Sequence, residues 1–164
     1  MEQIISPIPS QLLIQEVNHL DKRNHLISRG DFDVFWASAA QIPSILKEIG
    51  RLRELTFRSV GEGTGKKADI DEFDYYYHNL FIWDRKKSQI VGGYRLGLGE
   101  EIMPKGISCF YINSLFHIDP VVFPIIEKSI ELGRSYIVQE YQKGYLPFFL
   151  LWSCLLYTSD AADE

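Results

Sequence analysis

The chain has 164 residues, of which 46% are hydrophobic and 13% aromatic, so it is long and apolar enough to form one globular domain with its own core. Its formal net charge of -5 argues against a nucleic-acid-binding protein, which usually presents a basic face. Two cysteines are too few for a disulfide framework, the four histidines show no metal-ligand spacing, and no signal peptide is apparent, so we expect a cytoplasmic protein without metal.

Residues 1–30 are predicted to form an N-terminal extension ahead of the main domain, residues 31–153. In the extension, Ser6–Pro9 favours an extended backbone, and apolar positions recur at helical spacing from Gln11 to Leu20. Asn24–Asp31, which contains Gly30, is typical of a turn.

The domain is predicted to open with a strand at Phe32–Trp36, in which Phe32, Val34 and Trp36 alternate with Asp33 and Phe35. A helix follows to about Arg58, with Ser38 as its cap and Pro43 in its first turn. Its apolar face comprises Ile42, Ile45, Leu46, Ile49, Leu52 and Phe57. Its opposite face is predicted to be solvated and carries Lys47, Glu48, Arg51 and Glu54.

The glycine-rich stretch Gly61–Lys67 lacks the spacing of a Walker phosphate loop, and no strand leads into it. We interpret it as a mobile loop that folds over a substrate. It leads into four acids within six residues, Asp69–Asp74, and two interpretations stay open. The acids form a pocket for an amine, or they are helix N-terminal charges ahead of the run Tyr75–Tyr77.

An antiparallel hairpin is predicted next, with strands at Asn79–Trp83 and Gln89–Leu96. Gly92 and Gly93 indicate a bulge or a close backbone approach within the second strand. Arg95, near the end of that strand, is either a surface charge or the partner of the acidic cluster.

Beyond the hairpin we expect a loop over Gly97–Gly106 and a short helix from Asp119 to about Ser129. A strand then spans Ile130–Val138. Its Glu131 and Arg134 are three residues apart and lie on opposite faces of an ideal strand, so a bulge or splay is needed to bring them together. The alternative is an ordinary strand with ion pairs at the surface.

The last part of the chain is predicted to form a polar turn at Gln139–Gly144 and a helix that begins near Pro147, whose apolar run is too short to span a bilayer. Residues 154–164 resemble the in-frame translation of a transposase adapter used in sequencing libraries. We therefore expect the genuine sequence to stop near Ser153 and to be a truncated reading frame, inactive and poorly soluble by itself.

Five motifs in order resemble the GNAT-like acyltransferases, specifically the hemolysin-like branch that makes ornithine and glycine lipids. The motifs are Ile49–Arg58, the Gly-Thr-Gly-Lys loop with Asp69–Asp74, Ile82–Asp84, Ile90–Arg95 and Glu131–Ser135. Their skeleton is also similar to that of acyl-homoserine lactone synthases. The resemblance implies an α/β fold with a mixed, largely antiparallel sheet flanked by helices.

The resemblance implies transfer of a fatty acyl group from an acyl-carrier-protein thioester to a small amine such as glycine or ornithine. The amine is itself the nucleophile, so a carboxylate must accept its proton, with Glu131 as first candidate and Asp71 as second. Arg95 and Arg134 are expected to order the acids or to hold the carboxylate of the acceptor. The catalytic candidates are Glu131, Arg134, Asp71, Asp69, Asp74 and Arg95.

In GNAT enzymes the turn after the central strand binds coenzyme A, but here that turn lacks the full glycine-rich signature, which favours acyl carrier protein over acyl-CoA as donor. The candidates for substrate and donor binding are Arg53, Phe57, Ile137, Val138, Gln142, Lys143 and Gly144. No tightly bound cofactor is expected, and the implied location is the cytoplasm, with peripheral contact at the inner face of the membrane. Two alternatives stay open: an acetyl-CoA-dependent N-acetyltransferase and a non-catalytic interaction domain.

Overall fold

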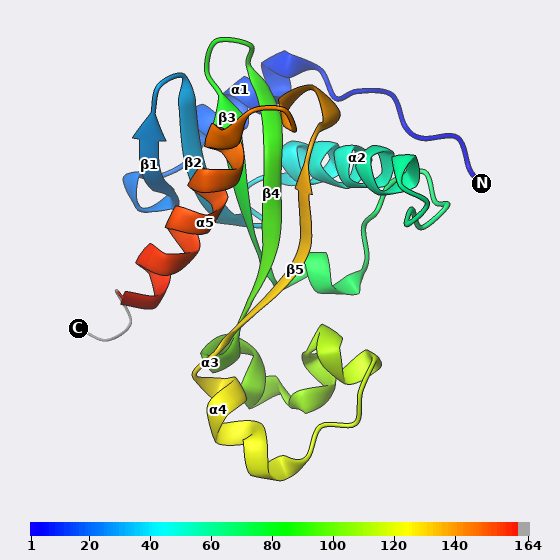
Figure 1. Ribbon diagram of the computed structural model, residues 1–164, viewed down its shortest axis with the longest axis vertical. Coiled ribbons are helices and arrows are strands. Elements are labelled where there is room, and N and C mark those ends of the chain that lie inside the picture. The colour runs from blue at the N-terminus through cyan, green and yellow to red at the C-terminus, as the bar shows by residue number, and fades with distance from the viewer. Residues whose placement is uncertain (161–164) are drawn as a thin grey trace.

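Five strands form one antiparallel sheet in the order in which they occur along the chain (Figure 1). The computed structural model describes residues 1–160. The strands are β1 (His25–Arg29), β2 (Phe32–Ser38), β3 (His78–Asp84), β4 (Gln89–Leu98) and β5 (Ile130–Ile137). Helices flank this sheet, so the expected α/β fold is confirmed.

Helices cover both faces of the sheet (Figure 1). α1 (Ser10–His19) and α2 (Pro43–Ser59) pack on one face, and α5 (Tyr145–Asp160) packs on the other. Successive side chains of β3 point to opposite faces of the sheet. Phe81 packs in the core under α2, and Leu80 packs in the core under α5.

Short helical elements fill the connections, and residues 99–129 form a lobe beyond one end of the sheet (Figure 1). The expected loop after β4 therefore contains helix, whereas the helix expected from Asp119 is present. The elements are η1 (Lys22–Asn24), η2 (Glu72–Tyr75), α3 (Gly99–Ile102), η3 (Met103–Lys105), η4 (Ile107–Cys109), η5 (Tyr111–Ser114), η6 (Pro120–Val122), α4 (Phe123–Glu127) and η7 (Gln139–Tyr141).

The turn expected over Asn24–Asp31 is wrong, because most of this segment is β1. β1 pairs with β2, and the turn itself contains Gly30 with a φ of 58°. β1 lacks a clear apolar alternation, and its hydrogen bonds to β2 define it as a strand.

Ser38 does not cap α2, whose N-cap residue is Ile42. The free N–H groups of the first turn are satisfied from α1 instead, since the Glu16 carboxylate accepts hydrogen bonds from Ser44 N at 2.7 Å and Ile45 N at 2.8 Å. α1 is thereby fixed against the start of α2.

The expected solvated face of α2 is wrong for two glutamates, since Glu48 and Glu54 are buried. The Glu54 carboxylate accepts hydrogen bonds from Thr64 N at 3.0 Å, Thr64 Oγ1 at 2.6 Å and Gly65 N at 2.9 Å, and it pairs with Arg58. A buried carboxylate needs such donors. The glycine-rich loop, expected to be mobile, is therefore anchored on α2.

The predicted hairpin is present as β3 and β4, and its two glycines permit close contact between strands. A Cβ atom on Gly92 would lie 3.0 Å from Ile137 Cα, and one on Gly93 would lie 3.3 Å from Phe81 Cα. Any side chain at these positions would force the neighbouring strands apart.

β5 contains a bulge, which was one of the two alternatives expected from the spacing of Glu131 and Arg134. Gly133 pairs with Arg95 and Tyr136 pairs with Gly93, so β5 has one residue more than β4 between these pairs. Within this interval Arg134 has a φ of 52°, a conformation uncommon for a residue with a side chain. The bulge redirects Arg134 toward the face that carries Glu131.

α5 continues without a break through the expected boundary at Ser153 to Asp160, and Cys154 is buried in the core under this helix. Part of the expected adapter-derived tail, residues 161–164, lies outside the described residues. None of the helices within residues 1–160 combines the length and the apolar character needed to cross a membrane.

Candidate active site

Three arginines and three aspartates from distant parts of the chain form one network between α2 and the sheet. Arg53 extends from α2, Arg95 from β4 and Arg134 from the bulge in β5. The aspartates precede or belong to η2 and are Asp69, Asp71 and Asp74. Their formal charges balance, which allows a fold to bury most of them.

The buried half of the network is centred on Asp74. Arg53 Nη2 lies 2.9 Å from Asp74 Oδ2, and Arg95 Nη1 lies 3.4 Å from the same oxygen. Arg53 Nε also lies 3.4 Å from Asp69 Oδ2. The side chains of these four residues are at most 2% exposed, so this half can stabilise the site but cannot contact a substrate.

The outer half of the network reaches solvent. Arg134 Nε lies 3.0 Å from Asp69 Oδ2, Arg134 Nη2 lies 3.5 Å from Asp71 Oδ2, and Arg95 Nη1 lies 2.5 Å from Asp71 Oδ1. The side chains of Arg134 and Asp71 are 22% and 24% exposed. One cation and one anion therefore face solvent side by side.

Local backbone geometry holds the aspartates in place. The Asp71 side chain accepts a hydrogen bond from Phe73 N at 3.0 Å, and the Asp74 side chain accepts one from Asp71 N at 2.9 Å. Asp69 N donates to Gly50 O at 2.9 Å, and a Cβ on Gly50 would collide with Ile70. The glycine in α2 thus permits the acidic segment to lie against the helix.

Aromatic rings enclose Arg95 and Arg134, and sequence reasoning missed them. The Arg95 guanidinium lies 5.4 Å from the ring centroid of Phe73, 5.5 Å from that of Tyr77 and 5.4 Å from that of Tyr111. Arg134 lies 5.2 Å from the centroid of Tyr111. Nothing in the local sequence of Tyr111 identifies it, because it reaches the site from the lobe.

Glu131 lies on the same side as Arg134, and both contact Tyr111. Its Oε2 accepts hydrogen bonds from the Tyr77 hydroxyl and from Tyr111 N, the latter at 3.1 Å, and its Oε1 accepts one from Ile112 N at 2.7 Å. A carboxylate has about four acceptor positions. Within the described residues, one position on Oε1 is therefore left for a further donor.

The outer pair is charged at neutral pH. Burial raises the pKa of Asp71, but the hydrogen bond and charge of Arg95, with the charges of Arg134 and Arg53, lower it more, so the net shift is below the ordinary value. Burial lowers the pKa of Arg134, yet the contact with Tyr111 and the charges of Asp69 and Asp71 raise it overall. A carboxylate held ionised in this way binds a cation well and is a weak base.

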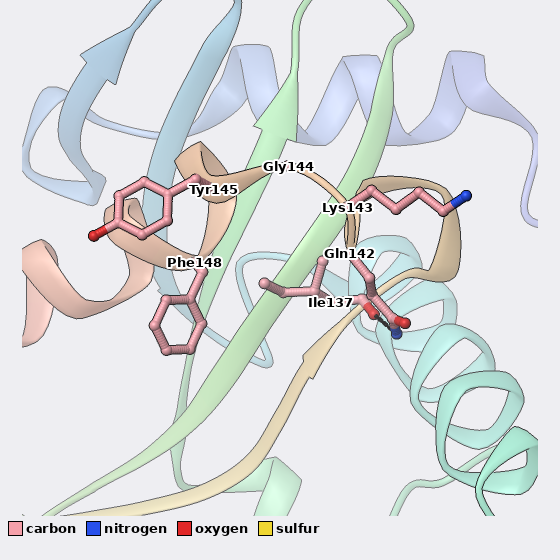
Figure 2. Close-up of a pocket in the computed structure, with 6 residues that line it drawn as sticks. All are labelled: Ile137, Gln142, Lys143, Gly144, Tyr145 and Phe148. Carbon is pink, nitrogen blue, oxygen red and sulfur yellow. Dashed lines mark hydrogen bonds between the residues drawn. The ribbon is translucent and has the colours of Figure 1, made fainter.

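A separate pocket of about 430 Å³ lies where β5 leads into α5 (Figure 2). Figure 2 shows Tyr145 and Phe148 on one side of this pocket and Gln142 and Lys143 on the other. Gln142 Nε2 donates to Ile137 O at 2.8 Å. The pocket is lined by Ile137, Gln142, Lys143, Gly144, Tyr145 and Phe148.

Four of the residues expected to bind substrate or donor thus share one pocket, and three lie elsewhere. Val138 is buried in the core under α2, and its N–H donates to Val91 O at 2.9 Å. Phe57 packs against the same core. Arg53 is buried in the ionic network, so none of the three can contact a donor in the pocket.

Known proteins resemble this chain in sequence. Residues 52–152 match the protein family described as Acetyltransferase (GNAT) domain. A glycine N(alpha)-acyltransferase of Bacteroides thetaiotaomicron is 34% identical over 167 aligned positions, and one of Phocaeicola vulgatus is 35% identical over 167. These alignments cover 94% of this chain but 49% and 51% of the two relatives, so the chain spans about half of their length. No solved structure shows a significant match.

Proposed function

Because the chain belongs to the GNAT acetyltransferase family, we propose that the protein transfers a fatty acyl group from a thioester to the amine of a small amino acid, in aminolipid biosynthesis. Glycine is the favoured acceptor over ornithine, since both similar relatives are named glycine N(alpha)-acyltransferases. The observation that carries the proposal is the outer pair of the ionic network, Asp71 and Arg134.

The outer pair suits an α-amino acid, which is a zwitterion at neutral pH. Arg134 has the planar donor geometry that binds a carboxylate, and ionised Asp71 attracts an ammonium. The two partners lie 3.5 Å apart at their nearest charged atoms, so one small molecule can contact both. Arg95 is buried on Asp71 and Asp74, which leaves the carboxylate of the acceptor to Arg134.

Glu131 is the proposed proton acceptor, with the free position on Oε1 receiving a proton from the ammonium through water. The neutral amine then attacks the thioester carbonyl, a C–N bond forms and the C–S bond breaks. The second proton of the nitrogen passes to the leaving thiolate, so the carrier protein departs as a thiol, and Glu131 returns the first proton to solvent. Backbone N–H groups along β5, one of the two outermost strands of the described sheet, are candidates to stabilise the oxyanion.

The proposed donor is an acyl carrier protein whose thioester arm enters the pocket beside α5. Ile137, Tyr145 and Phe148 give this pocket apolar walls suited to an alkyl chain. Two N–H groups of the preceding turn are already used, since Gln142 N donates to Gln139 O and Gly144 N to Tyr141 O. Such a turn offers few donors for the pyrophosphate of coenzyme A.

Docking of the carrier protein is proposed at the basic end of α2 and the anchored loop. Five basic residues lie along this part of α2 and the loop. Arg53 is buried, and Arg51 and Arg58 pair with glutamates, so Lys66 and Lys67 are the exposed cations among the five. The association is expected to weaken steeply with salt. A salt-independent affinity would contradict this docking site.

A second candidate function is acetyl transfer from acetyl-CoA, because the matching family is described as an acetyltransferase. Isothermal titration separates the two. Tight binding of acetyl-CoA would favour the second candidate, whereas the first predicts weak binding.

The test of the leading proposal uses a long-chain acyl-carrier-protein thioester with glycine, glycinamide or methylamine, and mass spectrometry of the products. We expect N-acylglycine from the full-length native protein and much less product from the two amines without a carboxylate. Arg134→Ala should raise the KM for glycine by about tenfold or more, since a charged hydrogen bond is lost. Glu131→Gln should lower kcat instead, and near-native turnover in both variants would overturn the site assignment.

A further inference from the structure

The glycines of the sheet region differ in what a side chain would meet. A Cβ on Gly97 would lie 2.5 Å from Tyr77 Cε2, and one on Gly99 would lie 2.7 Å from Glu127 O. Gly92 and Gly93 are likewise enclosed by neighbouring strands. At Gly133 a Cβ would meet nothing within 4 Å, and the backbone there does not have a positive φ.

Packing therefore explains Gly92, Gly93, Gly97 and Gly99 but does not explain Gly133. A glycine within a strand weakens it, because it offers no side chain to pack and loses more backbone freedom on folding. An alanine would fit at Gly133 without a clash. Among the described residues, no atom occupies the space next to Gly133 in which a side chain would stand.

This open volume faces the candidate active site. Gly133 pairs directly with Arg95, so their side-chain directions lie on the same face of the sheet. Glu131, two residues earlier, shares that face, and Arg134 in the bulge is its next neighbour. The free volume thus lies at the outer edge of the ionic network, where Arg134 and Asp71 meet solvent.

We propose that Gly133 is a specificity-determining residue, whose missing side chain leaves the volume that the α-carbon and side chain of the acceptor amino acid occupy. The inference rests on the proposed transfer to an amino acid and deepens it. A side chain at position 133 competes with the acceptor for this volume, and it competes more strongly with a larger acceptor.

The test compares Gly133→Ala and Gly133→Val with the native protein, using glycine, L-alanine and L-ornithine as acceptors. The matched control is Leu132→Ala, because Leu132 is the preceding residue, 47% exposed and directed to the opposite face. Steady-state kinetics give KM and kcat for each acceptor, equilibrium dialysis gives the affinity for radiolabelled glycine, and melting temperatures report folding.

Gly133→Ala should raise the KM for ornithine about tenfold, the scale expected for one methyl group in a binding site. It should raise the KM for glycine less, by about threefold, because the smaller acceptor needs less of this volume. Gly133→Val should raise the KM for glycine at least about tenfold and weaken its binding in dialysis to a similar extent. Melting temperatures should stay constant or rise, and Leu132→Ala should leave all acceptor constants unchanged.

Unchanged acceptor selectivity in folded Gly133 variants would overturn the inference while leaving the proposed function intact. Loss of folding in Gly133→Ala would also overturn it, because the volume would then belong to the protein core. If the native protein acylates no amine, the proposed function fails, and dialysis still decides the role of Gly133. In that case the inference on Gly133 would be contradicted if Gly133→Val did not weaken glycine binding, or if the native protein bound no glycine.

Discussion

At the scale of single residues, the ionic network separates stabilising charges from reactive ones. Arg53 and Asp74 are buried and paired, so they fix the geometry without touching solvent. Arg134 and Asp71 are the exposed members, and the non-glycine left-handed conformation of Arg134 is a strained feature of the kind that clusters at functional sites.

Arg53→Met should destabilise the fold strongly. It leaves Asp74 without its main partner in a site from which water is excluded, and breaking a buried ion pair in this way typically costs about 3–5 kcal/mol. Urea denaturation monitored by circular dichroism measures the loss. The control Lys47→Met changes the same charge at an exposed position of α2 and should cost under about 0.5 kcal/mol. Equal stability of the two variants would contradict the structural role of Arg53.

Glu54 should make stability depend on pH in the acid range. Burial raises the pKa of Glu54, but hydrogen bonds from Thr64, Arg58 and Gly65 lower it further, so the net shift is below the ordinary value of 4.5. A carboxyl whose folded pKa is depressed contributes stability that is present above the unfolded pKa and is lost as pH falls through the folded pKa.

Glu54→Gln tests this directly. The difference in free energy of unfolding between native protein and variant should be largest above about pH 5 and should shrink below about pH 4. Denaturant titrations at several pH values measure it. A difference that stays constant from pH 7 to pH 3 would show that the charge of Glu54 contributes nothing.

At the scale of elements, the glycine-rich loop connects α2 to the start of the chain. Glu54 holds the loop through Thr64 and Gly65, and the loop in turn pairs with the N-terminal segment, since Glu2 N donates to Gly65 O at 2.7 Å and Ile5 N donates to Lys67 O at 3.0 Å. Loosening the loop should therefore also loosen the N-terminal segment.

Thr64→Val removes the hydroxyl that donates to Glu54 and accepts from Lys66 N. We expect a loss of about 1 kcal/mol in stability and faster hydrogen exchange at the amides of Glu2 and Ile5. The control is Thr56→Val on α2, whose hydroxyl makes no hydrogen bond among residues 1–160. Unchanged exchange at Glu2 and Ile5 in Thr64→Val would contradict the coupling.

Elements with a regular apolar period were predictable from sequence, whereas contacts between distant segments were not. The spacing of Ile42, Ile45 and Ile49 is sufficient to predict α2, whereas the charges of Glu131 and Arg134 indicated the bulge in β5 as one of two alternatives. The burial of Glu54 was not predictable, because its donors come from a loop that has no regular pattern.

In the candidate site, too, local sequence patterns were informative and contacts between distant segments were not. An interaction between Arg95 and the acidic segment was expected as one of two alternatives, and the ion pair with Asp71 is present. The contacts of Tyr77 and Tyr111 with Arg95 were not predictable, because Tyr111 reaches Arg95 from the lobe and Tyr77 reaches it from the segment between η2 and β3. Local pattern identifies charged residues, but it does not identify the neutral surfaces that enclose them.

At the scale of the whole molecule, the two faces of the sheet are covered unequally (Figure 1). Within residues 1–160, two helices pack on one face, and α5 is the one helix on the other. Several aromatic side chains of α5 point away from the core and are exposed, namely Tyr145, Phe148, Phe149 and Trp152. Tyr145 and Phe148 share a pocket with Ile137 at the end of β5, and the Phe149 ring centroid lies 5.2 Å from the Arg29 guanidinium of β1. The apolar surface therefore reaches both outermost strands of the described sheet.

The 164-residue chain should therefore self-associate in solution. Replacing Phe148 and Trp152 together by glutamate places two charges one helical turn apart on the exposed side of α5, where burial against a second copy would cost their hydration. Multi-angle light scattering across a range of concentrations should show that the native chain associates as concentration rises and that the double variant stays monomeric.

The matched control replaces Leu55 and Val60 by glutamate, because both are exposed apolar residues of the α2 region and the change in net charge is the same. If added charge alone kept the chain monomeric, this control would behave like the α5 variant. If the α5 surface drives association, the control should associate like the native chain, since its glutamates lie on the far side of the sheet. A native chain that stays monomeric at high concentration would contradict the prediction that the exposed aromatic side chains of α5 drive self-association.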